Sequence, residues 1–91
     1  MYTVEYSNSF KHDLKRCAKR GYPIDDLYDV IELLKKSGTL PPQYRPHKLT
    51  GNYAGLWETH IKPDWLLVWS QNDTQLILLM TNTGTHADLF D

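Results

Sequence analysis

The chain of 91 residues has a single cysteine, Cys17, and no long apolar run. One cysteine excludes a disulfide within the chain and is compatible with a reducing compartment. A membrane-spanning helix needs about 20 consecutive apolar residues, and no segment approaches that length. The first six residues carry neither the basic region nor the apolar core of a signal peptide. We therefore expect a soluble, cytoplasmic protein that does not associate with membranes.

The chain also has almost no net charge, formally −1, so its overall charge does not indicate a nucleic-acid-binding protein. The charges are segregated, however. Residues 11–20 carry five Lys and Arg against one Asp, and residues 25–32 carry four Asp and Glu without a base. Such segregation produces either one basic face on a nearly neutral molecule or simply two solvated helix faces.

A recognisable metal-binding motif is missing as well. Histidine and aspartate are possible zinc ligands, but none of their spacings matches a known zinc motif and cysteine ligands are absent. We expect neither a metal nor another cofactor. The length leaves room for one domain, residues 1–91, without a second core.

Periodicity predicts an α+β domain with the element order β-α-α-β-β-β. Residues 2–6 alternate like a half-buried strand, and two helical patterns follow, which end at Gly21 and Gly38. The proline-rich stretch 39–46 and the glycine-containing stretch 47–55 predict a long loop with at most a short strand. The mixed apolar and polar stretch 56–61 and the apolar stretches 65–69 and 75–80 predict an antiparallel meander. We expect the two helices to pack as a hairpin on one face of a small, mainly antiparallel sheet.

Protonatable side chains flank Pro63 at the start of the buried run 65–69. The turn that Pro63 imposes would hold His60 and Asp64 near each other at the sheet edge. His47 and His86 lie in similar turn-like stretches and could converge on the same place. Imidazoles titrate near neutrality, so one can accept a proton while another donates one. A single such histidine is commonly just a surface residue, and the gathering of three with an aspartate is what indicates a site.

An acid/base pair of this kind is what RNA transesterification requires, because the 2′-OH of RNA is an internal nucleophile. Developing charge on the phosphorus would need a cation, and Arg45, Lys48 and Lys62 are the local candidates. Trp65 or Phe90 could stack on an unpaired base. Trp65 also fits a core position in the apolar strand.

Three blocks of the sequence resemble the YafQ family of bacterial toxins, within the RelE/ParE superfamily of type II toxin–antitoxin systems. They are HKLTGNYAG at residues 47–55, WETHIKPDWLLVW at 57–69 and TGTHADLF at 83–90. The resemblance covers essentially the whole chain and implies a RelE-like fold. It also implies a ribosome-dependent endonuclease that cuts mRNA in the A site without metal. The implied partners are the ribosome, its mRNA and a cognate antitoxin, in a hetero-oligomeric complex that binds operator DNA through the antitoxin.

The functional positions of the family fall on residues that are all present here: His47, His60, Asp64, Trp65, His86 and Phe90. On this resemblance we expect His60 or His47 to be the base, Asp64 to orient or assist it, and His86 to be the acid.

One position departs from the family, which usually carries arginine where this chain has Asn82. An asparagine donates a hydrogen bond but carries no charge toward the scissile phosphate. Either Arg45 or Lys62 substitutes for it, or this toxin is weakened or was altered to reduce its toxicity. The alternatives to an active nuclease are therefore a silenced toxin kept for antitoxin binding and autoregulation, or a ParE-like inhibitor of gyrase. The acid/base residues argue against the gyrase inhibitor, which has no use for them.

Overall fold

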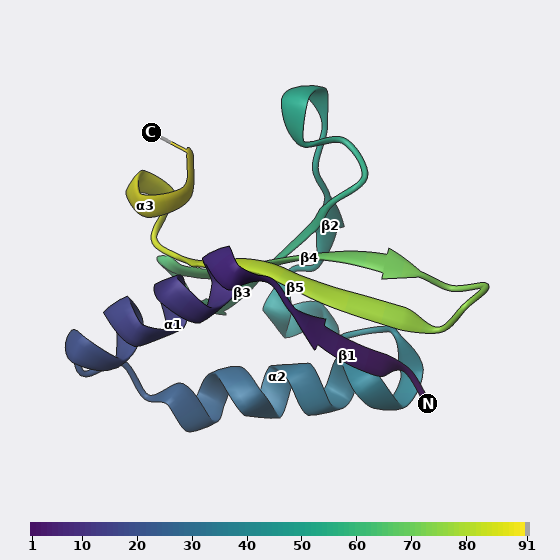
Figure 1. The fold of residues 1–91 in the computed structure, drawn as a ribbon, viewed down its shortest axis with the longest axis horizontal. Coiled ribbons are helices and arrows are strands. Elements are labelled where there is room, and N and C mark those ends of the chain that lie inside the picture. The colour runs from purple at the N-terminus through teal and green to yellow at the C-terminus, as the bar shows by residue number, and fades with distance from the viewer. Residues whose placement is uncertain (91) are drawn as a thin grey trace.

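The computed structural model describes residues 1–90 and shows a five-stranded sheet with two long helices on one face (Figure 1). The elements, in chain order, are β1 (Thr3–Tyr6), α1 (Asn8–Lys19), α2 (Ile24–Ser37), the 3₁₀ turn η1 (Pro42–Tyr44), β2 (His47–Lys48), the 3₁₀ turn η2 (Gly51–Tyr53), β3 (Trp57–Lys62), β4 (Trp65–Asn72), β5 (Ile77–Gly84) and α3 (His86–Phe90). None of the helices described within residues 1–90 is long and apolar enough to cross a membrane.

The strands lie in the order β1-β5-β4-β3-β2, with β1 parallel to β5 and every other pair antiparallel. The predicted α+β architecture is thus confirmed. The structure adds a two-residue strand, β2, inside the predicted loop, and a short C-terminal helix, α3, which sequence periodicity did not indicate. In Figure 1, α3 and the η2 segment lie on the side of the sheet opposite α1 and α2.

Local signals explain where the two long helices begin and end. The Ser7 hydroxyl accepts a hydrogen bond of 3.0 Å from the backbone N–H of Phe10 and so caps α1. Gly38 ends α2 in the left-handed conformation with φ of 73°, which glycine adopts at little cost. A side chain at Gly38 would also collide with the ring of Tyr2.

The main core lies between the helices and the sheet. Alternate residues of β4 point into it, namely Trp65, Leu67 and Trp69, and all three are at most 2 % exposed. The intervening residues Leu66 and Val68 are also buried, on the opposite face. Because β4 is buried on both faces, its sequence is continuously apolar, as the sequence pattern predicted.

Candidate active site

The register of the sheet brings chemically active side chains together on the face that α1 and α2 leave free. His47 of β2 pairs with Glu58 of β3, and Glu58 pairs with Val68 of β4. His60 pairs with Leu66. Residues paired across strands share a face, so these histidines and Glu58 lie on the side opposite the core residues Trp65, Leu67 and Trp69.

Glu58 is the buried centre of this group. Its Oε1 lies 3.7 Å from Nε2 of His47 and 3.8 Å from Nε2 of His60, and its side chain is only 5 % exposed. Glu58 was not among the site residues predicted from the sequence. The signal was present, since residues 58 and 60 of one strand must point to the same face. A single carboxylate oxygen therefore serves as counter-ion for whichever of the two rings carries a second proton.

The other nitrogen of each ring is fixed by a backbone carbonyl. Nδ1 of His47 lies 3.1 Å from the carbonyl oxygen of Arg45, and Nδ1 of His60 lies 3.2 Å from that of Pro63. A carbonyl can only accept, so each Nδ1 carries the proton that it donates there. Each Nε2 is consequently the nitrogen that takes up or releases protons, on the Glu58 side of the ring.

Asp64 contacts His86, not the two histidines on β2 and β3. Its Oδ1 lies 3.3 Å from both the backbone nitrogen and Nδ1 of His86. The turn at Pro63 directs the carboxylate toward the start of α3, so in the structure Asp64 contacts the predicted acid and not the predicted base. Nδ1 of His86 is thereby occupied, and Nε2 remains the nitrogen that can meet a substrate.

The ring centroids of His60 and His86 lie 6.1 Å apart. Proton transfer needs a heavy-atom distance of about 2.6–3.2 Å, so a reacting group between the rings can approach both. Phe90 continues this wall, with its ring 6.2 Å from that of His86 and 5.0 Å from that of Tyr53 in an edge-on contact. Tyr53, on η2, was not predicted and is 41 % exposed. Phe90 and Tyr53 together supply aromatic surface beside the histidines.

Three predicted binding residues contact other parts of the chain in the structure. Trp65 is 2 % exposed and donates its indole N–H to the Thr83 hydroxyl at 2.9 Å, so it is a core residue that cannot stack on a base. The ammonium of Lys48 lies over the ring of Trp57 at 5.5 Å, and that of Lys62 pairs with Asp26 of α2 at 3.1 Å. Strand alternation turns Lys48 away from His47, and an irregularity in the register between His60 and Lys62 turns Lys62 toward the helices.

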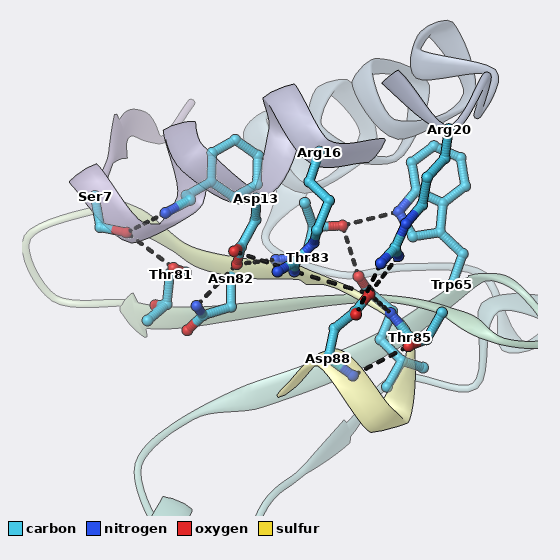
Figure 2. Close-up of polar contacts among 12 residues, drawn as sticks. Ser7, Asp13, Arg16, Arg20, Trp65, Thr81, Asn82, Thr83, Thr85 and Asp88 are labelled. Carbon is cyan, nitrogen blue, oxygen red and sulfur yellow. Dashed lines mark hydrogen bonds and ion pairs between the residues drawn. The ribbon is translucent and has the colours of Figure 1, made fainter. Parts of the chain in front are cut away.

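Asn82 lies on the site's face, because it pairs with Val68, the partner of Glu58. Its side-chain N–H donates to Oδ2 of Asp13 on α1 at 2.9 Å (Figure 2). The same carboxylate oxygen accepts from the backbone N–H of Thr83 at 3.2 Å, and the other oxygen pairs with Arg16 at 3.2 Å. Asn82 is thus anchored to α1. Arg45, two residues before His47, is exposed and remains the predicted cation near the site.

A second charged cluster adjoins the site at α3 and was not predicted from the sequence. Arg20 binds both oxygens of Asp88 at 2.6 and 3.1 Å, and Nη2 of Arg16 lies 3.8 Å from Asp88 (Figure 2). The hydrogen bonds from Arg20, with those from Thr85, hold the pKa of Asp88 well below its ordinary value, and Asp88 in turn raises the pKa of Arg20. Across the described residues 1–90, no group of three or more His, Cys, Asp and Glu is arranged to hold a metal ion.

Comparison with known proteins gives consistent matches along the whole chain. The family model described as "Bacterial toxin of type II toxin-antitoxin system, YafQ" matches residues 2–91. The mRNA interferase toxin YafQ of Escherichia coli K12 is 35 % identical over 88 residues, which cover 96 % of this chain and 94 % of that protein.

Solved structures agree with these sequence matches. The crystal structure of the E. coli DinJ–YafQ complex superposes with a TM-score of 0.90 at 34 % identity and covers all of both chains. A metal-bound toxin from Helicobacter pylori superposes with a TM-score of 0.90 at 37 % identity, covering 99 % of this chain and all of that one.

Proposed function

Because the chain belongs to the YafQ family of type II toxin–antitoxin toxins, we propose that it is an mRNA interferase. In this proposal it cleaves mRNA in the ribosomal A site by acid/base transesterification without a metal. The related E. coli protein is named mRNA interferase toxin YafQ, and a crystal structure of E. coli YafQ contains it in complex with DinJ. We propose by analogy that this chain is neutralised by a cognate antitoxin of its own.

One observation carries the proposal: three histidines and two carboxylates gather on one face of the sheet. His47 and His60 share Glu58, and His86 is paired with Asp64 at the start of α3. The first group comes from β2 and β3, and the second from the turn between β3 and β4 and from α3. They face each other across the 6.1 Å between the rings of His60 and His86. Such an arrangement suits the simultaneous removal and delivery of protons.

The proposed reaction uses the Nε2 atom of each histidine, because Nδ1 is already hydrogen-bonded to a carbonyl or a carboxylate. Nε2 of His60, or of His47, takes the proton of the 2′-OH, and the 2′-oxygen forms a bond to the adjacent phosphorus. The bond from phosphorus to the 5′-oxygen breaks, and Nε2–H of His86 protonates the leaving oxygen. The products are a 2′,3′-cyclic phosphate and a free 5′-OH. Glu58 is the counter-ion of the ring that gains a proton, whereas Asp64 holds His86 through Nδ1.

The proposal is tested with ribosomes programmed with a defined mRNA. Removing a general acid or base costs about 10²–10⁴-fold in rate, so His60→Ala and His86→Ala should each lose at least about 10²-fold. His12→Ala is the matched control, because His12 is exposed on α1. Its cleavage rate should equal that of the wild type. Undiminished cleavage by His86→Ala would remove His86 from the mechanism.

The specific contact of Asn82 favours one second candidate, a weakened or silenced toxin that is kept for antitoxin binding and autoregulation. Its amide donates to Asp13 and brings no positive charge to the site. An Asn82→Arg variant distinguishes the two readings. If charge is what limits the rate, the variant cleaves faster than the wild type, because a guanidinium there can stabilise the developing phosphorane charge. An equal rate, with active wild type, would show that another group already supplies the charge.

A further inference from the structure

α3 begins with a reciprocal pair of hydrogen bonds between residues 85 and 88. The backbone N–H of Thr85 donates to Oδ2 of Asp88 at 3.0 Å, and the backbone N–H of Asp88 donates to the Thr85 hydroxyl at 3.1 Å. This is a capping box, in which two side chains satisfy the free N–H groups at a helix start. It fixes the first turn of α3, which contains His86.

The carboxylate of that capping box is also the partner of α1. Arg20 grips it with two hydrogen bonds, through Nη1 at 2.6 Å and Nη2 at 3.1 Å. Figure 2 shows Arg16 and Arg20 extending from α1 past the end of β5 to Asp88. The Asp88 side chain is 14 % exposed, so this pair is shielded from solvent more than the pair of His86 with Asp64. Asp88 therefore joins the first turn of α3 to the rigid α1.

Without this link α3 has little to hold it. A helix of five residues is far too short to be stable by itself. Its other described side-chain contacts are the second pair of Asp88, with Arg16 at 3.8 Å, the exposed pair of His86 with Asp64, the His60 ring 6.1 Å from that of His86, and the edge of Phe90 against Tyr53. Gly84 completes the arrangement, because a Cβ there would lie 2.8 Å from Oδ2 of Asp88 and 3.1 Å from Nη2 of Arg16. The missing side chain is what lets the arginine–aspartate cluster close over the end of β5.

We propose that Arg20 and Asp88 are positioning residues, which clamp α3 onto α1 and thereby hold His86 opposite His60. The inference rests on the proposed nuclease function for its kinetic consequences. In this structure the guanidinium of Arg20 binds the carboxylate of Asp88 through one N–H of each terminal nitrogen, so its described partner is Asp88 and not the site. Its effect on the reaction is exerted through the placement of α3.

The kinetic test is a double-mutant cycle of Arg20→Ala and Asp88→Asn, assayed by cleavage on programmed ribosomes. Asparagine keeps an acceptor for Thr85 but loses the charge that binds Arg20. A displacement of about 1 Å in a catalytic group can cost about 10²-fold, so each variant should lose about 10- to 100-fold in kcat with KM nearly unchanged. The double variant should be no slower than either single one. Arg20→Lys, which keeps the charge but loses the fork, should be intermediate.

A direct contact of Arg20 with RNA predicts a different pattern and would overturn the clamp. Arg20→Ala would then raise KM, whereas Asp88→Asn would free the guanidinium and leave cleavage intact or faster. Lys19→Ala is the matched control for removing one positive charge from the end of α1, where Lys19 is exposed. The clamp predicts that this variant retains the wild-type kcat.

A second measurement does not depend on nuclease activity. ¹⁵N relaxation should give rigid order parameters for the amides of residues 86–90 in the wild type and values below about 0.6 in Asp88→Asn, with α1 and β5 unchanged. The nuclear Overhauser contact between the rings of Tyr53 and Phe90 should weaken in parallel. If α3 stays rigid in Asp88→Asn and in Arg20→Ala, the clamp is wrong, whether or not the wild type cleaves RNA. If α3 loosens while the wild type cuts nothing, the proposed function fails and the clamp stands.

Discussion

Glu58 was not predicted from the sequence, yet the structure places it at the centre of the candidate site. It lies almost completely buried, with one oxygen atom within 3.8 Å of two imidazole nitrogens. A buried carboxylate is costly unless it is paired, so its position between His47 and His60 is an electrostatic device as well as a structural one. In the proposed mechanism, it stabilises the ring that has just taken the proton from the 2′-OH.

Substituting Glu58→Gln should therefore reduce catalysis and leave the fold intact. A hydrogen bond or contact to a charged group contributes about 1.5–3 kcal/mol, which corresponds to roughly 10- to 150-fold in kcat/KM. The thermal midpoint should stay equal or rise, because the glutamine removes a buried charge without changing the volume. Rates on programmed ribosomes and a calorimetric scan measure the two effects. Glu32→Gln, an exposed acid of α2, is the control, and an unchanged kcat/KM in Glu58→Gln would contradict the role of Glu58.

The candidate acid/base residues could be predicted from the sequence, because residue type and a turn-like position are enough to indicate them. His47, His60, Asp64 and His86 stand out as polar, protonatable residues in turn-like stretches, and the structure brings them together. The direction of a side chain depends on the strand register, which the sequence leaves open. For this reason the sequence could not show that Lys48 lies over Trp57 and Lys62 pairs with Asp26, nor decide between the stacking and core positions of Trp65, which the structure places in the core.

At the scale of elements, the end of β5 and α3 form the part of the site that sequence periodicity did not show. Residues 81–88 are polar and turn-forming, and a helix of five residues has no apolar repeat to reveal it. The capping pair of Thr85 and Asp88 was the available signal. The long helices were predictable because their caps and apolar stripes agree with the final structure.

Gly84→Ala tests this arrangement at the level of the element. The added Cβ would push against Asp88 and Arg16, so α3 should shift and kcat should fall by about 10-fold or more. Gly21→Ala is the matched control, since Gly21 also has a positive φ, 81°, but nothing lies within 4 Å of its added Cβ. Both variants carry backbone strain of roughly 1 kcal/mol or more. Equal rates for the two would show that only strain matters and that the space above Gly84 is unimportant.

At the scale of the whole molecule, the Arg20–Asp88 pair should couple stability to pH. The pKa of Asp88 is lowered in the folded state by Arg20 and Thr85, so unfolding at low pH takes up a proton. The stabilisation is complete above the unfolded-state pKa of about 4 and is lost as the pH falls toward the folded-state pKa. Asp88→Asn should lower the thermal midpoint by a few degrees at pH 7, as expected for an ion pair of at most about 1 kcal/mol.

This difference between wild type and Asp88→Asn should narrow below about pH 4, where the aspartate of the unfolded chain is already protonated. Thermal scans by circular dichroism between acidic and neutral pH measure it. Asp25→Asn, an exposed acid of α2, provides a comparison without the arginine clamp. A difference that grows as the pH falls would show that the sign of the linkage is wrong.

The whole molecule is nearly neutral, and the lysines of α1 and most of the acids of α2 lie exposed on helices that cover the face of the sheet opposite His47 and His60. The proposed chemistry consequently depends on local geometry and on the nucleophile that RNA itself provides. This leads to one measurement above all others. A programmed ribosome carries an mRNA with a single 2′-deoxynucleotide at the scissile position, and cleavage is followed beside the matched all-ribose mRNA.

The proposed transesterification mechanism predicts that the all-ribose mRNA is cut to a 2′,3′-cyclic phosphate and a 5′-OH. The deoxy-substituted mRNA should stay intact at that position. Without the 2′-OH, His60 and His47 have no proton to remove and no nucleophile forms. Cleavage of the deoxy-substituted mRNA at a comparable rate would mean that water attacks instead. That result would contradict the transesterification mechanism.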